Sequence, residues 1–357
     1  MVSAFFMPQN GLGMHNVDKK PVIRRWFQLF LNLFSILKAK ITAIGTAVPD
    51  RIIDNHYFET FLETTDEWIR SRSGITTRRF AADDEFTSDL CLRAAHDLAG
   101  QYQKDLADVD FVIVATITPD LTMPTVAAIL QDRLGLKNAG AIDISAACAG
   151  FSYGITLANG LIAAGTHRKI LVFGSETLSR ITDFTDRSSC VLFGDGAGAV
   201  LVEADDTGNI LAAITGSEGS GGKDLYLTNQ PRAIQGLEAV ADGKIHQNGR
   251  AVFKWAVSTV AQVMQDLSKK AGIPLDQIDW FVPHSANLRI IEALCQTANF
   301  PIEKTLESIT LFGNTSSASI PLAFARGISE GKVRRGDTVM LIGFGGGLVY
   351  SGIVFKW

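Results

Sequence analysis

One stretch of sequence decides the fold: Ile144-Ser145-Ala146-Ala147-Cys148-Ala149-Gly150-Phe151. It follows an apolar, strand-like run and begins a helix-like run, and a similar arrangement recurs at residues 309–315. Residues 109–113 (Val-Asp-Phe-Val-Ile) likewise resemble residues 278–282 (Ile-Asp-Trp-Phe-Val), which lie 169 positions later. Because these matches keep their order along the chain, we predict that it contains two similar halves.

The alternation of element types predicts the fold class. Beyond the N-terminal region, short runs rich in valine and isoleucine alternate with helix-like stretches, and residues 110–116 and 169–174 are typical of buried strands. This pattern indicates an α/β protein whose sheets are covered by helices on both faces. Turn residues at 205–208 predict an N-terminal half over residues 40–207 and a C-terminal half over residues 208–357.

The first 39 residues form an extension outside this pattern. Residues 26–37 are apolar, but the run is too short to span a bilayer. It lacks a small-residue cleavage site and continues through Lys38-Ala39-Lys40 into a strand-like segment, which excludes a secretory signal. Three interpretations stay open: a surface helix that contacts a membrane or a partner, a helix docked on the protein's own body, and an extension without a catalytic role. Of these we favour the third.

Composition excludes several classes of protein. A chain of 357 residues with 46% apolar and 20% charged residues is typical of globular proteins, which excludes disordered, collagen-like and disulfide-scaffold chains. The net charge of −4 and the lack of a long basic run argue against nucleic-acid binding. The four cysteines are far apart and show no Cys-x-x-Cys spacing, so we expect no metal site, reduced thiols and a cytoplasmic location.

Cys148 is the candidate nucleophile. It lies between a strand and the start of a helix, where unpaired N–H groups and the helix dipole favour a thiolate, so we expect a lowered pKa. Its alanine and glycine neighbours leave room for a ligand. Cys91 and Cys295 lie inside helix-like stretches, and we expect them to be buried structural residues.

His284 and Asn314 are candidate partners of this cysteine. His284 follows the strand-like residues 280–283, and Asn314 lies at an apparent strand-to-helix junction, close to the repeat equivalent of Cys148. Asn314 alone is also explained as a helix N-cap. A neutral imidazole and a neutral amide aimed at one carbonyl oxygen would stabilise a developing enolate without holding back a carboxylate that leaves as CO2.

Two glycine clusters have different explanations. Gly194, Gly196 and Ala199 come close to a dinucleotide-binding fingerprint, but a strand follows them instead of a helix, which excludes that interpretation. The cluster at residues 343–347 indicates close backbone approach or positive φ angles. Its N–H groups could form an oxyanion hole opposite Cys148.

Together these motifs resemble β-ketoacyl-acyl carrier protein synthase III, a condensing enzyme of the thiolase superfamily, over about residues 40–357. The resemblance implies a homodimer and a thiolase-like fold, with two homologous halves in a layered α-β-α-β-α core. The matching pieces are Asp66-Glu67-Trp68-Ile69, Arg72-Ser73-Gly74-Ile75, the Cys148 stretch, Thr185-Asp186-Arg187, residues 193–199, residues 283–290, Gly313-Asn314-Thr315-Ser316 and residues 345–347.

The resemblance also implies a reaction. Cys148 takes an acyl group from acyl-coenzyme A, and His284 and Asn314 assist the decarboxylation of malonyl-acyl carrier protein, whose carbanion then attacks the acyl-Cys148 thioester. The backbone amides of Cys148 and Gly346 resemble the acyl oxyanion hole. Both thioesters are substrates, so no cofactor is expected.

Further positions are implied by motif match alone. Coenzyme A is expected at five residues: Trp68 and Arg187 around the adenine, Arg72 near the phosphates, and Phe253 and Asn287 along the pantetheine. Lys254 and Arg289, with Arg250 added, resemble residues that receive the acidic carrier protein. Met123 stands where several members carry an aromatic residue that reaches the partner's acyl pocket, so we expect branched or medium-length primers to be accepted.

Residue types separate this chain from related enzymes. The glycine segment at residues 343–348 has no second cysteine, unlike thiolases, and Asn314 replaces the second histidine of the elongating synthases. Residues 345–347 are all glycine, whereas plant-type polyketide synthases usually have a glycine-proline variant. Two alternatives stay open: an acyltransferase that serves another acceptor in a specialised pathway, and a non-catalytic binding protein with a thiolase fold.

Overall fold

The computed structural model describes residues 37–230, 232–234 and 236–357. The apolar run at residues 26–37 lies outside the described residues except for Leu37, so its three interpretations stay open. Within the described part of the chain, no helix is both long enough and apolar enough to cross a membrane.

The first sheet has five strands, in the order β1-β7-β6-β4-β5. β4 runs parallel to β5 and β6, whereas β7 is antiparallel to both of its neighbours. β6 is almost wholly buried, as the apolar run at residues 170–173 predicts for a strand covered on both faces, and the burial continues over the polar residues 175–177 at its end. The bounds are β1 Lys38–Ala47, β4 Phe111–Ala115, β5 Gly140–Ile144, β6 Lys169–Thr177 and β7 Asp195–Asp205.

The second sheet has four strands, in the order β13-β14-β15-β8, and repeats the arrangement β4-β6-β7-β1. The two halves are offset by 169 positions, from Phe111 to Trp280 and from Lys169 to Thr338. This repetition confirms the two similar halves. The predicted boundary at residue 207 falls between β7 and β8 and stays a prediction. The bounds are β8 Ile210–Ser217, β13 Trp280–Pro283, β14 Thr338–Gly345 and β15 Val349–Lys356.

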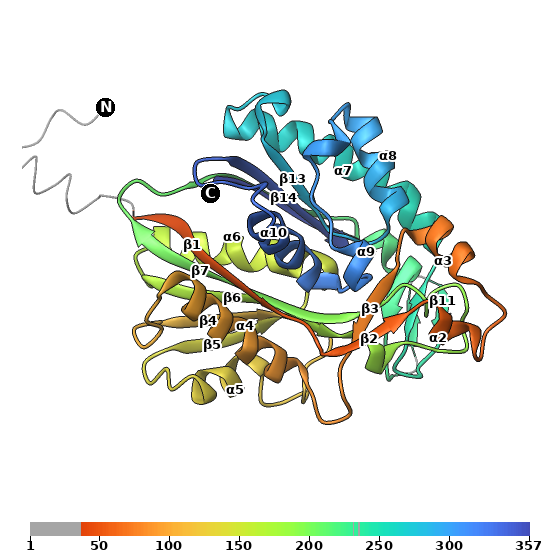
Figure 1. Cartoon of the computed structure of the whole chain (residues 1–357). Helices are drawn as coiled ribbons and strands as arrows, with labels where there is room; N and C mark the ends of the chain where they lie inside the picture. The colour runs from red at the N-terminus through yellow and green to blue at the C-terminus, as the bar shows by residue number, and fades with distance from the viewer. Residues whose placement is uncertain (1–36, 231, 235) are drawn as a thin grey trace, which may run out of the picture. The chain divides into compact units, whose positions relative to one another are not determined.

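The helices form three layers around the two sheets (Figure 1). α6 and α10 lie between the sheets and contact strands of both, while α4 and α5 cover the first sheet and α7, with α8 beside it, covers the second. The result is the predicted α-β-α-β-α layering. The bounds are α4 Thr87–Tyr102, α5 Val126–Arg133, α6 Gly150–Ala163, α7 Gly249–Ala271, α8 Leu288–Ala298 and α10 Ser319–Ser329.

One part of the repeat prediction is wrong. Asn314 does not follow a strand, because Ile309–Phe312 form a short helix, α9, where the offset from β5 would place a strand. The edge of β13 is already occupied by a bridge between Phe281 and Thr305, which leaves no place for a fifth strand. The repeat equivalent of Cys148 is therefore Ser317, since the single turns η1 (Ala147–Ala149) and η6 (Ser316–Ala318) are 169 positions apart.

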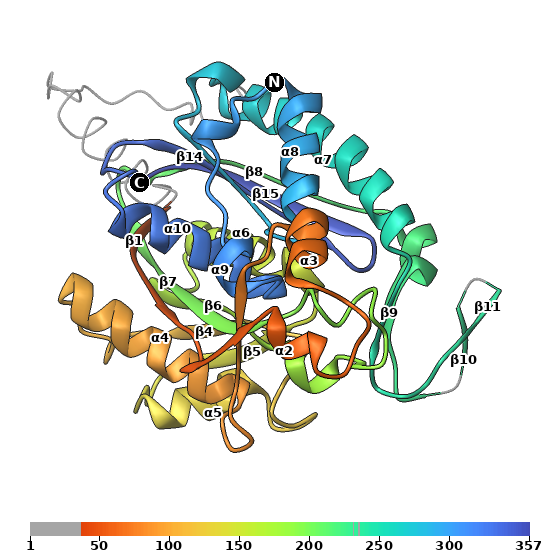
Figure 2. The ribbon, with the colours of Figure 1, turned by 45° about the vertical axis from the view of Figure 1, so that its right-hand side comes forward.

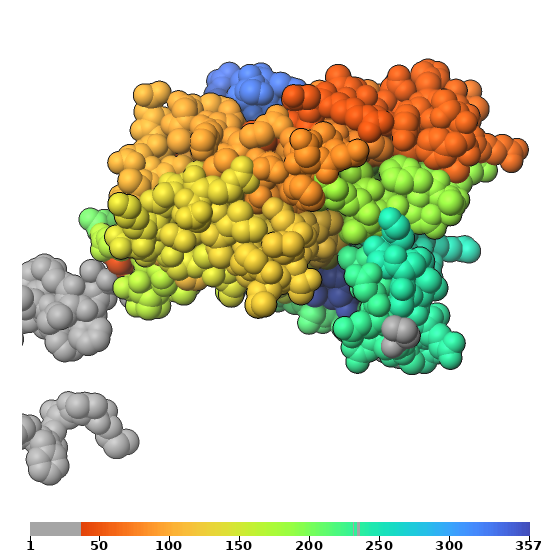
Figure 3. Space-filling view, turned by 90° about the horizontal axis from the view of Figure 1, so that it is seen from below, coloured from red at the N-terminus to blue at the C-terminus, as the bar shows by residue number. Residues whose placement is uncertain are grey.

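Smaller elements surround this core. β2 (Arg51–Asp54) pairs with β3 (Thr77–Phe80), and α2 (His56–Glu59) and α3 (Asp66–Ser73) lie between them in the chain. An arm at residues 225–247 contains two short antiparallel pairs, and Figure 2 shows its outer pair, β10 and β11, projecting beyond the start of α7. In Figure 3 dark blue atoms of the C-terminal segment show between this blue-green arm and the yellow part of the chain. The strands of the arm are β9 Leu225–Leu227, β10 Arg232–Ile234, β11 Leu237–Ala239 and β12 Ile245–Gln247.

Local sequence explains where the helices near the site begin. The Thr65 side chain accepts a hydrogen bond from the Trp68 N–H and starts α3. Asn248 caps α7 in the same way, and Asn287 accepts from the Arg289 N–H at the start of α8. Polar caps of this kind typically stabilise a helix by about 1 kcal/mol, and here they fix the helix ends that carry the predicted binding residues.

Candidate active site

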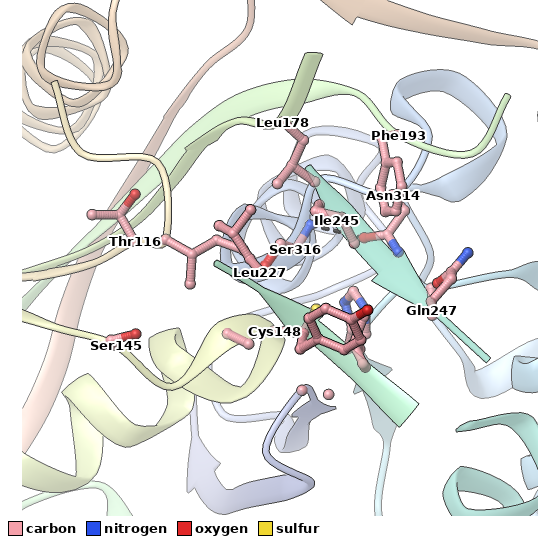
Figure 4. A pocket seen from close by; sticks show the side chains of 18 of the residues that line it. Thr116, Ser145, Cys148, Leu178, Phe193, Leu227, Ile245, Gln247, Asn314 and Ser316 are labelled. Atoms are coloured by element: carbon pink, nitrogen blue, oxygen red, sulfur yellow. Dashed lines mark hydrogen bonds between the residues drawn. The ribbon is translucent and has the colours of Figure 1, made fainter. Parts of the chain in front are cut away.

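A cavity of about 570 Å³ is lined by residues of both halves. Cys148, His284 and Asn314 all line it, and Figure 4 shows Cys148 and Asn314 facing the same space. No lysine or arginine is among the described residues around it. Its apolar wall includes Ile117, Leu178, Phe193, Leu225, Leu227 and Ile245.

Cys148 lies in η1, the single turn between β5 and α6. Ala147 has a φ of 44°, a left-handed conformation that is unfavourable for a non-glycine residue and turns the chain sharply before the cysteine. A Cβ atom at Gly345 would lie 2.9 Å from Cys148 Cβ, and one at Gly343 would lie 2.9 Å from the Cys148 carbonyl oxygen. The backbone of this glycine cluster therefore packs closely against Cys148, in agreement with the predicted close approach.

The predicted low pKa of Cys148 is wrong. Burial raises the pKa of the thiol from its ordinary value near 9 to about 12. A helix N-terminus contributes at most about 2 kcal/mol, which lowers a pKa by only about 1.5. Burial therefore has the larger effect, and the resting residue is a neutral thiol.

His284 follows β13 and is only 2% exposed. Its backbone N–H donates to the Ile342 carbonyl oxygen at 2.8 Å, and its ring meets the Phe344 ring edge-on with centroids 5.3 Å apart. Nδ1 lies 2.7 Å from Ser319 Oγ. Burial lowers the pKa of His284 to about 3, so the imidazole is neutral at physiological pH.

Asn314 is held in place through its backbone and its side-chain oxygen. Its N–H donates to the Leu192 carbonyl, and its own carbonyl accepts from the Gly194 N–H. Oδ1 accepts from the Ser316 N–H at 2.9 Å, so Asn314 does cap the next turn. Because this bond assigns the amide orientation, the Nδ2 group is left with its hydrogens as donors for the cavity.

We expect the alkylation of Cys148 by iodoacetamide to become about tenfold faster per pH unit between pH 6 and pH 9, without a plateau. The thiolate is the reactive form, and its fraction keeps growing at every pH below a pKa of about 12. Intact-protein mass spectrometry with Cys148→Ala as the blank measures this rate. A plateau below pH 8 would contradict the account, since it would reveal a stable resting thiolate.

Trp68 and Arg187, predicted to enclose an adenine, lie in direct contact. The Arg187 guanidinium carbon lies 4.5 Å from the centroid of the Trp68 ring. A purine between them needs about 7 Å, which is twice the contact distance of two carbon atoms. The exposed Arg187 side chain must therefore move before the pair can hold a base.

Phe253 and Asn287 line the cavity, as the pantetheine prediction requires. Asn287 Nδ2 donates to the Arg72 carbonyl oxygen at 3.1 Å, which joins the end of α3 to the start of α8. One Nδ2 hydrogen remains for a ligand. The Arg72 side chain is exposed and does not line the cavity.

The three predicted carrier-protein residues, Arg250, Lys254 and Arg289, are all exposed. Arg250 and Lys254 are four residues apart on α7, and Arg289 lies in the first turn of the neighbouring α8. None of the three has an ion-pair partner among the residues that the structure describes. They do not line the cavity.

Gly346 lines the cavity beside Cys148, but Met123 does not. The Met123 side chain is 85% exposed. That Met123 reaches a partner's acyl pocket stays a prediction. The role of the Gly346 amide in an oxyanion hole also stays a prediction.

Three parts of the site were not predicted. Ser319 contacts His284, and the Glu176 carboxylate accepts hydrogen bonds from Thr116, Thr118 and Ser317 beneath the cavity. The arm supplies residues 225–227 to the wall. The offset of 169 positions could have pointed to Ser319, because this residue is the repeat equivalent of Gly150 in the Cys148 stretch.

Residues 142–219 match the family model for 3-oxoacyl-[acyl-carrier-protein] synthase III, and residues 268–357 match the model for its C-terminal part. The chain is 52% identical over 324 residues to β-ketoacyl-[acyl-carrier-protein] synthase III 2 of Halalkalibacterium halodurans, covering 90% of this chain and 98% of that protein. The chain belongs to the β-ketoacyl-[acyl-carrier-protein] synthase III family.

Other members give the same result. The synthase III 2 of Bacillus subtilis is 51% identical over 90% of this chain and 99% of its own. The solved structure of the Thermus thermophilus synthase III has a TM-score of 0.86 at 43% identity, covering 89% of this chain and 99% of that one. The thiolase-like fold predicted from the motifs is confirmed as the fold of this synthase III family.

Proposed function

We propose that the protein starts type II fatty-acid synthesis by condensing an acyl-coenzyme A primer with malonyl-acyl carrier protein, releasing CO2 and forming 3-ketoacyl-acyl carrier protein. The observation that carries this proposal is the meeting of Cys148, His284 and Asn314 at one apolar cavity in a member of the synthase III family. Both thioesters are substrates, and the proposed chemistry uses no other cofactor.

In the first half-reaction Cys148 is the nucleophile. Its sulfur forms a bond to the acyl carbon and coenzyme A leaves, while the backbone amides of Cys148 and Gly346 stabilise the oxyanion between these events. The thiol starts as a neutral group, so its proton must be removed as the sulfur attacks. His284 is the neutral base at the same cavity.

In the second half-reaction the malonyl group loses CO2, and the resulting carbanion attacks the acyl-Cys148 carbonyl. The Cys148 sulfur leaves and regains a proton from solvent. The Asn314 Nδ2 group donates to the thioester oxygen where negative charge develops. The described lining carries no lysine or arginine that would hold the departing carboxylate back.

Exposed residues support the proposed partners. Arg250, Lys254 and Arg289 are exposed basic residues without an ion-pair partner among the residues that the structure describes, which suits an acidic carrier protein. A homodimer is favoured by the free edge of the first sheet at β5, whose Ile142 is 44% exposed, and by the exposed Met123. We place the enzyme in the cytoplasm, in keeping with its four unpaired cysteines.

A primer panel tests the function and the role of Met123 together. With malonyl-acyl carrier protein present, we expect isobutyryl- and hexanoyl-coenzyme A to yield ketoacyl products in addition to acetyl-coenzyme A, because a flexible methionine accommodates varied chains. Mass spectrometry of the carrier protein measures each product. Met123→Phe is expected to shift turnover toward acetyl-coenzyme A. Turnover of acetyl-coenzyme A alone by the wild type would refute the primer prediction, and no product from any primer would refute the function.

A further inference from the structure

Arg78, on β3, is a fully buried cation that the proposed mechanism does not use. It has no ion-pair partner among the residues that the structure describes, and its guanidinium lies over the Phe58 ring, 4.6 Å from the centroid. Burial lowers the pKa of the guanidinium to about 10, so the side chain is still charged at physiological pH. Because a buried charge without a counter-ion is costly, stability alone does not explain this residue.

The Arg78 guanidinium joins two segments that are far apart in the chain. Nη2 donates to the Val191 carbonyl oxygen at 2.6 Å. Nη1 donates to Asn55 Oδ1 at 2.9 Å and to the Ile53 carbonyl oxygen at 3.4 Å. The bond to Val191 is the shortest of the three, as expected for a charged donor at a well-placed acceptor. Arg78 therefore holds the backbone at residue 191 against β2.

The segment held by Arg78 is the one to which Asn314 is bonded. The Asn314 N–H donates to the Leu192 carbonyl oxygen at 2.8 Å, and the Gly194 N–H donates to the Asn314 carbonyl oxygen at 3.0 Å. A Cβ atom at Gly313 would lie 2.8 Å from the Leu192 carbonyl oxygen, so the two backbones touch. The same atom would lie 3.2 Å from Arg78 Cβ, and a Cβ atom at Gly194 would lie 3.1 Å from it. The Arg78 side chain thus packs where the two segments meet.

We propose that Arg78 is a positioning residue that fixes the backbone of Asn314, so that its Nδ2 group points into the cavity beside His284 for the decarboxylation step. This inference rests on the proposed function and deepens it. Asn314 and His284 line the cavity, whereas Arg78 does not. Arg78 therefore acts on the reaction through Asn314, and no bond is made or broken at the guanidinium.

The residue type agrees with this role. A guanidinium presents a rigid fork of donors that reaches acceptors on two sides, whereas a lysine offers a single point of donation and an apolar side chain offers none. Val191 is only 2% exposed, so its carbonyl oxygen would lose a donor that water does not easily replace. Movement of this segment displaces Asn314, and a misplacement of about 1 Å can slow a reaction by about 100-fold.

Hydrogen–deuterium exchange of the peptides that contain the Asn314 and Gly194 amides tests the positioning without substrate. Both amides should be protected in the wild type, and in Arg78→Met they should exchange at least about tenfold faster, the factor expected for the loss of about one net hydrogen bond. Fast exchange of both amides in the wild type would overturn the proposal, and so would unchanged exchange in Arg78→Met.

Arg79→Met is the matched control. Arg79 is the next residue on β3, and its Nη1 bonds the carbonyl oxygens of residues 49 and 50 instead of residue 191. It should exchange at the wild-type rate at both amides. If Arg78→Met does not fold, Arg78→Lys replaces it, since a lysine keeps the charge and holds only one of the two segments; the same changes are expected.

Single-turnover mass spectrometry supplies the kinetic readout. Arg78→Met should load an acyl group within about twofold of the rate of Arg79→Met and should discharge it at least about tenfold more slowly. The double variant with Asn314→Ala should discharge no more slowly than Asn314→Ala alone, because the two residues act as one unit.

A purely structural role of Arg78 would slow both half-reactions and would add to the effect of Asn314→Ala. Equal slowing of loading and discharge would therefore overturn the proposal, and so would additive effects in the double variant. Amide exchange needs no substrate, so failure of the proposed function, seen as no acyl loading in the wild type, is told apart from failure of the positioning by Arg78.

Discussion

Cys148→Ala is expected to lower the condensation rate by about four orders of magnitude or more, to the background of the assay. Loss of a covalent nucleophile removes the whole acyl-enzyme route rather than one contact. No other thiol lines the cavity among the described residues, so nothing there can replace it. The variant should still decarboxylate malonyl-acyl carrier protein slowly, because His284 and Asn314 are unaltered.

Cys295→Ala is the matched control for this variant. Cys295 is 3% exposed within α8, and its sulfur contacts the Thr305 hydroxyl, away from the cavity lining. It should condense at the wild-type rate, with only a modest loss of stability. Acyl mass found on the Cys148→Ala protein would contradict the assignment of the nucleophile.

Asn314→Ala is expected to load an acyl group at nearly the wild-type rate and to discharge it about 100- to 1,000-fold more slowly. This range is typical for the removal of one neutral donor from an oxyanion site. The Nδ2 group is the donor that the structure leaves free, because Oδ1 is already bonded to the Ser316 N–H. Single-turnover mass spectrometry, with loading and discharge started separately, measures both rates.

Asn314→Asp provides the comparison for this variant. An aspartate keeps the oxygen that caps the next turn and replaces the donor by an acceptor, so it should discharge at least as slowly as the alanine variant. Equal slowing of loading and discharge in both variants would mean that Asn314 only supports the local fold.

The convergence of Cys148, His284 and Asn314 could be predicted because each belongs to a repeated or motif-bearing segment. The offset of 169 positions makes β13 and β14 the counterparts of β4 and β6, and a site between two such halves is expected to draw residues from both. The glycine cluster was predicted to serve either close backbone approach or positive φ angles, and both occur: Gly343 and Gly345 approach Cys148, and Gly347 has a φ of 146°.

The features that the sequence did not predict depend on contacts between segments that are far apart in the chain. A helix start suggests a lowered cysteine pKa, but burial raises the pKa of Cys148. Gly343 and Gly345, which lie far along the chain, pack against this residue. Residues 309–312 are apolar enough for a strand, yet Thr305 already occupies the edge of β13. The Arg187 guanidinium lies over the Trp68 ring. A motif that assigns both residues to ligand binding does not reveal this direct contact between them.

The most direct test of the account is intact-protein mass spectrometry of the wild type mixed with an acyl-coenzyme A primer and then with malonyl-acyl carrier protein. We expect one acyl adduct, absent from Cys148→Ala, which disappears on the second addition as 3-ketoacyl-acyl carrier protein forms. An adduct that persists would favour transfer to a different acceptor, and a protein that takes up no acyl group from any primer would contradict the central claim.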